Sequence, residues 1–541
     1  MEKISGNIVD LIGFRIYPGT LVISGGRIKD IIPGKRKYRE FILPGFVDAH
    51  IHIESSMLPP AEFARLAVAH GTVATVSDPH EIGNVLGVAG VEYMIREGKR
   101  VPFKFYFGAP SCVPATSFET SGSEIIPGDV DRLMKRAEIK YLSEVMNYPG
   151  VIARDKDFMA KIKSSLDKGK PVDGHAPGLR GGLLKKYASA GISTDHESFE
   201  YKEGLEKIKL GMKLIIREGS AAKNFEALIP LLDLYPDSCM FGSDDKHPDD
   251  LARGHINLLV ERALKKGINV FKVLRAASLN PVKHYKLAVG LLQKNDPADF
   301  IITANLDDLN ILATVIDGQQ VAAKGKSLIP AKKAALVNKF AALQITLKDL
   351  AVRQKTGKMR VMAALDKQLV TGKLTVKPAA GLNGFVAADP LRDILKIAVV
   401  NRYKKALPSV GFIKNFGLKK GAIASSVAHD SHNVVAVGAN DEDLLLSINS
   451  ILGIKGGLSV VYKNKVTLLE LPIGGLMSGR DGYEVARKYE ELDRLAKKLG
   501  SRLTSPFMTL SFMALPVIPS LKITDKGLFD VDKFRPVDLF I

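Results

Sequence analysis

The sequence has no tryptophan, only two cysteines and no long apolar run. Cys112 and Cys239 stand far apart, which excludes a disulfide framework and a cysteine metal site. No stretch approaches the ~18 consecutive apolar residues that a membrane helix needs. The start, Met1-Glu2-Lys3, has an early acid and no long apolar segment behind it, unlike a secretory signal. We therefore expect a cytoplasmic protein without a membrane partner.

The positive charge is the one strong bias in composition. The chain has 541 residues and a formal net charge of +19, which raises the question of nucleic-acid binding. The basic residues are spread along the whole chain, and short clusters such as Lys35-Arg36-Lys37 have one aromatic neighbour, Tyr38. Without a known nucleic-acid motif, a basic surface with no nucleic-acid partner is the favoured interpretation.

The length predicts two or three domains. Residues 1–44 and 296–340 contain short apolar runs broken by glycines, and they predict one composite β-sandwich domain built from two separated pieces. Residues 45–295 alternate apolar strands with helical stretches, which is typical of an α/β fold with a parallel sheet. Residues 341–541 predict a C-terminal α/β domain, with helices at 334–351 and 483–499 and strands at 384–388 and 434–438.

Eight short apolar segments in the central region predict parallel strands, and eight is the number that closes a (β/α)₈ barrel. Helical spacing of apolar residues at 61–70 and 251–266 predicts two of the helices that return the chain. The eight segments are residues 45–52, 72–78, 103–109, 141–145, 171–174, 193–195, 213–216 and 239–242.

Histidines collect where such a barrel keeps its active site, at the C-terminal ends of the strands. Glu144 ends the fourth predicted strand and Asp244 follows the eighth, close to these histidines in the predicted fold. Six of the 11 histidines fall at or shortly after predicted strand ends: His50, His52, His80, His175, His196 and His247.

These residue types in this pattern indicate a two-metal site. His50 and His52 alternate along a strand, so their rings point to the same side. The Glu144 carboxylate would be costly on an apolar strand unless paired or metal-bound, and its two oxygens can bridge two ions. His175 and His196 would complete the second ion. Taken singly, each residue could instead be a core histidine or part of a buried ion pair, and their shared position favours metal binding.

Asp244 can bind a metal and also accept a proton from a bound water, with Asp245 as the competing assignment and a solvated turn as the alternative for both. Two ions lower the pKa of a water that they share. Nitrogen and oxygen ligands without cysteine permit Zn²⁺, Mn²⁺ or Fe²⁺. The predicted ligands are His50, His52, Glu144, His175, His196 and Asp244.

The run Pro-Gly-Phe-Val-Asp-Ala-His-Ile-His at 44–52, the later histidines and the last aspartate resemble the amidohydrolase superfamily. More closely, the chain is similar to the bacterial and archaeal adenine deaminases. The strings that carry this closer resemblance are residues 52–56, 77–82, 217–220, 243–245 and 428–433. The resemblance spans nearly the whole chain.

The resemblance implies hydrolysis of adenine to hypoxanthine and ammonia at two divalent ions, Mn²⁺ or Fe²⁺ before Zn²⁺. It also implies that Glu144 takes the place of a carboxylated lysine found in sister enzymes. Related deaminases have a glutamate after the fifth-strand histidine, but residues 175–178 contain none, so Glu218 is the substitute expected to protonate the purine ring. An ion pair between Arg217 and Glu218 is the alternative.

His80, Glu81, Arg217 and Ser220 are expected to contact the substrate, with loop stabilisation as the alternative for His80 and Glu81. The segment His429-Asp430-Ser431-His432 is expected near the pocket or at a subunit contact, and a structural turn is its alternative. A homo-oligomer is also expected. Two other functions stay open: an amidohydrolase acting on another purine, a pyrimidine or a cyclic amide, and an inactive scaffold, which the presence of all six ligands disfavours.

Overall fold

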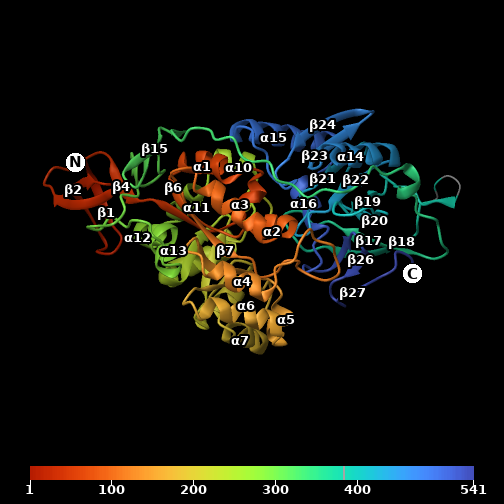
Figure 1. Cartoon of the computed structure of the whole chain (residues 1–541), viewed down its shortest axis with the longest axis horizontal. Coiled ribbons are helices and arrows are strands. Elements are labelled where there is room, and N and C mark those ends of the chain that lie inside the picture. The colour runs from red at the N-terminus through yellow and green to blue at the C-terminus, as the bar shows by residue number, and fades with distance from the viewer. Residues whose placement is uncertain (380, 382–383) are drawn as a thin grey trace.

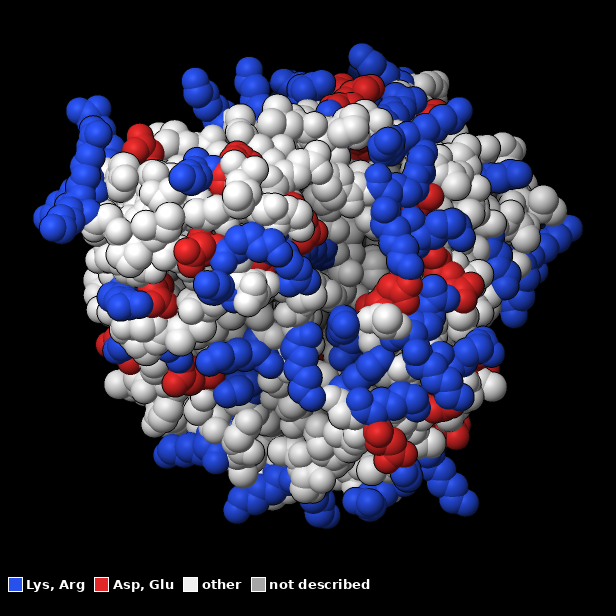
Figure 2. All heavy atoms as spheres, turned by 60° about the vertical axis from the view of Figure 1, so that its left-hand side comes forward, with Lys and Arg blue, Asp and Glu red and all other residues white. Residues whose placement is uncertain are grey.

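The structure is a computed structural model of the chain, and it describes residues 1–379, 381 and 384–541. Figure 1 shows three regions in a row: an N-terminal sheet at one end, a barrel in the middle, and C-terminal sheets and helices at the other end. No helix within these described residues is long and apolar enough to cross a membrane. Lys and Arg side chains are spread over the face drawn in Figure 2, with acidic side chains among them.

Eight parallel strands form the barrel, at the eight places that the sequence predicts. They pair in the orders β5-β6-β7-β8-β9 and β10-β11-β12. Backbone hydrogen bonds close both seams, because Ser193 N–H donates to Val172 O and Asp244 N–H donates to His50 O, each at 2.8 Å. The strands are β5 (Phe46–Ile51), β6 (Thr72–Ser77), β7 (Lys104–Ala109), β8 (Ile139–Val145), β9 (Val172–Gly174), β10 (Thr194–Asp195), β11 (Lys213–Arg217) and β12 (Cys239–Gly242).

Helices return the chain around the barrel. The helix predicted at 61–70 is present as α1, but the one predicted at 251–266 is divided into α10 and α11. His255 interrupts it, because its backbone is not helical and its Nε2–H donates to the Asp48 carboxylate at 2.7 Å. The helices are α1 (Pro60–Val68), α2 (His80–Leu86), α3 (Val88–Gly98), α4 (Pro127–Met134), α5 (Tyr148–Ile152), α6 (Lys156–Leu166), α7 (Gly181–Ser189), α8 (Tyr201–Lys209), α9 (Phe225–Leu234), α10 (Pro248–Arg253), α11 (Ile256–Lys265), α12 (Val270–Leu274) and α13 (Asn280–His284).

The N-terminal region is one continuous eight-stranded sheet made from both sides of the barrel sequence, in the order β16-β15-β14-β13-β4-β1-β2-β3. The two pieces join where β13 pairs antiparallel with β4, which sets Ile302 opposite Ile42. The strands are β1 (Glu2–Asp10), β2 (Arg15–Ser24), β3 (Arg27–Pro33), β4 (Phe41–Pro44), β13 (Phe300–Thr303), β14 (Ile311–Ile316), β15 (Gln319–Ala323) and β16 (Lys326–Ser327).

The C-terminal region has an eight-stranded sheet in the order β18-β17-β20-β19-β22-β21-β23-β24 and a small sheet β25-β26-β27. It docks on the barrel beside α1, where Gly482 N–H donates to Glu62 Oε2 at 2.9 Å. Its elements are β17 (Met359–Ala363), β18 (Gly372–Val376), β19 (Ile394–Val400), β20 (Ser409–Lys414), β21 (Ala422–Ser425), β22 (Val434–Gly438), α14 (Asp441–Ile454), β23 (Gly457–Tyr462), β24 (Lys465–Glu470), α15 (Gly482–Lys498), α16 (Pro506–Phe512), β25 (Leu521–Thr524), β26 (Gly527–Asp530) and β27 (Arg535–Pro536).

Two C-terminal expectations are wrong, while the predicted strand 434–438 and the predicted helix 483–499 are present as β22 and α15. The stretch 334–351 is not a helix, apart from a short 3₁₀ turn at Leu347–Leu350. Its backbone bonds to other segments instead, for example from Ala341 N–H to Arg402 O at 2.7 Å. The stretch 384–388 is not a strand, and Phe385 pairs with Arg353 in an isolated bridge.

Candidate active site

The strand ends of the barrel bring all six predicted ligands together. His50 and His52 leave β5 side by side, and their Nε2 atoms lie 3.4 and 3.2 Å from Asp244 Oδ1. Asp244 has a left-handed backbone (φ 54°), a conformation that aspartate tolerates better than most residues. Its N–H donates to the His50 carbonyl, so the backbone holds its carboxylate at the histidine pair.

Glu144 stands at the centre of the cluster, and its two oxygens face different histidines. Oε1 lies 3.4 Å from His52 Nε2, while Oε2 lies 2.7 Å from His175 Nδ1 and 2.9 Å from His196 Nε2. Burial raises the pKa of Glu144, but its interactions with His175 and His196, including hydrogen bonds from both rings, outweigh it and hold the pKa well below its usual range. Glu144 is therefore a carboxylate whose two oxygens can serve two ions.

Unpaired ring nitrogens show that this donor set fits divalent cations. Both ring nitrogens of His50 and the Nδ1 of His196 are buried without a hydrogen-bond partner in the part of the chain that the structure describes. Burial and the neighbouring His50 lower the pKa of His196 to about 3, and burial and His52 lower that of His50. Both rings are therefore neutral, the form that binds metals. Ligand atoms of His50, His196 and Asp244 lie within 4.8 Å of one another, as do those of Glu144, His175 and His196.

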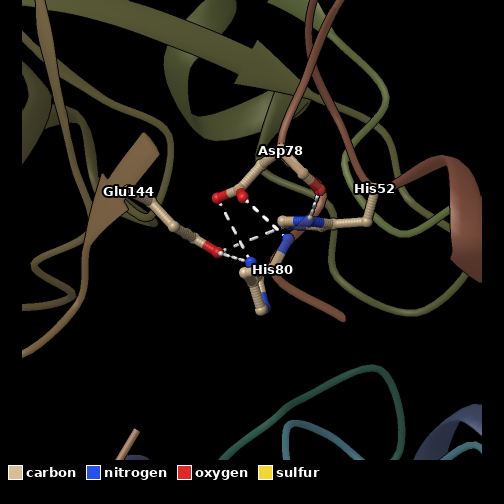
Figure 3. Close-up of side chains that lie close together, drawn as sticks. All are labelled: His52, Asp78, His80 and Glu144. Carbon is tan, nitrogen blue, oxygen red and sulfur yellow. Dashed lines mark hydrogen bonds and ion pairs between the residues drawn. The ribbon is translucent and has the colours of Figure 1, made fainter. Parts of the chain in front are cut away.

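Asp78 and His80 enlarge the cluster on the His52 side (Figure 3). His52 Nδ1–H donates to the Asp78 carbonyl at 3.2 Å, and His80 Nδ1 lies 3.2 Å from Asp78 Oδ2 and 3.5 Å from Glu144 Oε1. Together these four residues form another compact donor group. Asp78 is not among the site residues predicted from the sequence, although an acid directly after a buried strand was a usable signal.

Arg217 contacts the Asp244 carboxylate at Oδ2, the oxygen other than the one that faces His50 and His52. Its Nη1 contacts Asp244 Oδ2, and its Nη2 lies 2.8 Å from Glu197 Oε1. Burial raises the pKa of Glu197, but Arg217 and the nearby histidines lower it by more than burial raises it, so Glu197 is ionised. Glu197 lines the cleft and was also missed, although it directly follows His196. Arg217 is not among the residues that line the cleft and contacts Asp244 instead, while its expected substrate contact stays a prediction from the sequence.

The cleft above these residues is closed by the C-terminal region. The cleft is tight: the centre of a water-sized sphere can move within only ≈ 20 Å³, which is room for about one water molecule. His80 and Glu81, both expected near the substrate, line this cleft. The roof residues are Leu369, His429, Asp430, Phe512, Leu515 and Ile518.

Comparison with known proteins adds the family. Residues 41–321 match the amidohydrolase family, and residues 368–535 match the adenine deaminase C-terminal domain. The chain is 52% identical over 553 residues to an adenine deaminase of Methanosarcina mazei, with 100% of both chains covered. An adenine deaminase of a Sulfurovum strain is 53% identical, with 99% of both chains covered. One of Salinibacter ruber is also 53% identical, with 100% of this chain and 99% of the relative covered. The chain belongs to the adenine deaminase family of amidohydrolases.

In this family member, two expected site residues lie outside the cleft. Glu218 points away from it, because its carboxylate pairs with Arg262 Nη1 at 2.8 Å and lies 3.8 Å from Lys223 Nζ. Ser220 donates to Asp250 Oδ2 at 2.6 Å and lines a separate surface cleft of ≈ 940 Å³ between the barrel and α15. Neither Glu218 nor Ser220 is among the residues that line the cleft, so the geometry gives no support to their expected roles in ring protonation and substrate contact, which stay predictions from the sequence.

Proposed function

We propose that the protein hydrolyses adenine to hypoxanthine and ammonia. The observation that carries the proposal is full-length identity of 52% to a relative named as an adenine deaminase, which includes the C-terminal domain that roofs the cleft. A purine-sized, planar substrate is consistent with a cleft that apolar side chains such as Phe512 and Leu515 close from above. Other amidohydrolase substrates have no comparable support.

We propose two divalent ions as the cofactor, held by His50, His52, Glu144, His175, His196 and Asp244. Imidazoles and carboxylates without cysteine suit Mn²⁺ or Fe²⁺, and Zn²⁺ is the alternative. When bound, such ions would supply Lewis acidity that lowers the pKa of water.

The protein's own residues perform the proton transfers in this proposal. Asp244 accepts a proton from the attacking water and passes it to the amino group that leaves C6. Arg217 keeps the Asp244 carboxylate turned towards His50 and His52. The roof excludes bulk water, which strengthens each electrostatic contact inside the cleft.

The domain division into 1–44 with 296–340, 45–295 and 341–541 is part of the proposal. It is consistent with the three sheet systems of the fold. The cytoplasmic location and the homo-oligomer remain predictions from the sequence.

The test is ammonia release from adenine by protein loaded with Mn²⁺, with a chelated sample alongside. Guanine, cytosine, adenosine and a hydantoin are run in parallel. A matched pair of variants separates loss of the site from loss of the fold. His50→Asn removes a proposed metal ligand. His284→Asn removes the last residue of α13, whose Nε2 lies 3.3 Å from Ser193 Oγ.

Metal-dependent release from adenine alone, lost in His50→Asn and kept in His284→Asn, is the expected result. Turnover of another substrate in place of adenine would overturn the substrate assignment. Full activity after complete metal removal would overturn the metal assignment.

A further inference from the structure

One barrel carboxylate lies between two histidines of the C-terminal roof. Glu81 is the second residue of α2, and His429 and His432 stand in the loop between β21 and β22. Glu81 Oε1 contacts His429 Nδ1, and Glu81 Oε2 contacts His432 Nε2. All three side chains are buried, so the cluster links the active-site barrel to its roof.

The hydrogen bonds define the role of His432. Ala428 N–H donates to His432 Nδ1 at 3.2 Å, so Nδ1 carries a lone pair and the ring proton is on Nε2. That proton is donated to Glu81. Burial lowers the pKa of His432, consistent with a neutral ring. His432 therefore orients the Glu81 carboxylate and is not free to do other chemistry.

His429 differs from His432, because only one of its two ring nitrogens makes a hydrogen bond. Its Nδ1–H donates to Glu81, while its Nε2 has no hydrogen-bond partner among residues 1–379, 381 and 384–541. This Nε2 faces the cleft, 3.8 Å from Asp245 Oδ1, and the ring stacks on Phe512 with centroids 4.5 Å apart. A buried, fixed and unpaired nitrogen at the cleft is placed to meet a ligand.

The Glu81 carboxylate, which accepts the hydrogen bond from His429 Nδ1, fixes the orientation of the imidazole ring and stabilises its protonated form. Burial lowers the pKa of His429, but the charges of Glu81 and Asp245 outweigh it and raise the pKa to about 9. His429 therefore carries a proton on Nε2 near neutral pH. The other side of the cleft, around Asp244 and Glu144, offers acceptors for the protons of water.

We propose, on the basis of the proposed function, that His429 is the catalytic acid that protonates N1 of adenine, and that Glu81 and His432 position it. As the water oxygen bonds to C6, the π electron pair of C6–N1 moves to N1, which takes the proton of His429 Nε2. The C6–amino bond then breaks, and the amino group leaves as ammonia with a proton from Asp244. The second water proton returns to His429 through solvent, so adenine and water yield hypoxanthine and ammonia.

A metal ion is the rival occupant of this cluster. One ligand atom each of His80, Glu81 and Asp430 lies within 4.8 Å of the other two, so these residues could hold a cation. Against that, both Glu81 oxygens already accept hydrogen bonds from histidines. The experiment therefore counts metal ions as well as turnovers.

The test compares His429→Asn with the control His284→Asn in the full, Mn²⁺-loaded chain. Asparagine can still donate to Glu81 but has no group at the position of Nε2. The readouts are kcat for adenine, metal ions per chain, and the inhibition constant of 1-deazaadenine, in which C–H replaces N1. Glu81→Gln is included as the positioning variant.

We expect His429→Asn to lower kcat by about 100-fold or more, the usual contribution of a general acid. Metal content should not change, and 1-deazaadenine should bind within about twofold of its wild-type affinity, because it lacks the atom that His429 contacts. Glu81→Gln should show the same pattern with a smaller fall in kcat.

Three results would overturn the inference. They are a kcat for His429→Asn within about threefold of the control, a loss of one metal ion per chain, or a loss of 1-deazaadenine affinity as large as the loss of kcat, which would indicate a structural role. Failure of the wild-type protein to deaminate adenine would instead refute the proposed function itself.

Discussion

Lys207 makes a buried ion-pair network that supports the two histidine loops. Its Nζ lies 2.8 Å from Asp195 Oδ2 and 2.8 Å from Glu203 Oε1, and it donates to Ala176 O at 2.8 Å. Asp195 in turn accepts from Ala176 N–H at 3.1 Å. The network therefore ties the loop after β9 to the end of β10, next to His175 and His196.

Lys207→Met removes the charge and leaves the Asp195 carboxylate buried without its cation. Burial raises the pKa of Asp195, and Lys207 is the main group that lowers it again. Breaking a buried pair in this way costs about 3–5 kcal/mol, because the remaining charge has lost both water and partner. For a domain of barrel size this corresponds to a fall of about 10 °C in the unfolding midpoint.

Thermal unfolding is followed by circular dichroism, since the chain has no tryptophan. Lys209→Met is the matched control, because Lys209 lies on the same helix α8 and is exposed. It should change stability by less than about 0.5 kcal/mol. Adding Asp195→Asn to Lys207→Met should recover part of the loss, because Glu203 is then the one carboxylate partner of Lys207 still without its cation. A Lys207→Met midpoint equal to that of the control, or a double variant less stable than the single one, would refute the reasoning.

Three further predictions concern the site and the roof. Glu144→Gln should weaken metal affinity by at least about tenfold, because it removes the carboxylate that faces four imidazoles. The loss is seen as a lower metal content by elemental analysis after dialysis. Glu218→Gln should keep kcat within about threefold and lose only its pairing with Arg262, worth about 1 kcal/mol or less; a 100-fold fall in kcat would contradict its position outside the cleft. Burial lowers the pKa of Lys522 from 10.5 to about 7. The unfolded chain therefore holds a proton there that the folded chain lacks, so stability should rise as pH increases from about 7 to about 10. Lys522→Met should flatten this rise in the unfolding midpoint, and an unchanged slope would contradict the assignment.

The barrel and the cluster of its six predicted ligands were accessible from the sequence because their signals are local. A short apolar strand that ends in a polar residue is readable within a few positions, as at Glu144 or at His50 and His52. Since parallel strands end on one side of a barrel, such residues must converge. A composite β-sandwich domain was predicted in the same way, from similar strand patterns on both sides of the barrel segment, and in the structure strands from both pieces pair in one sheet.

Helix predictions failed where distant contacts replaced local ones. Residues 334–351 have helical composition, yet Ala341 bonds to Arg402 and the segment follows the surface of another region. The predicted helix 251–266 is divided because Asp48, 207 residues away, binds His255. Helical propensity is worth only tenths of a kcal/mol per residue, so one buried polar contact can override it.

The sequence by itself determined which residue types stand at the barrel's strand ends, and with them the barrel and the six residues proposed as ligands, because backbone periodicity and strand polarity are local properties. Only the tertiary structure decided that Glu218 turns to Arg262, that Arg217 holds Asp244, and that His429 meets Glu81 across 348 positions. The direction of a side chain at a strand end depends on which charge lies next to it in space. No pattern along the chain contains that information.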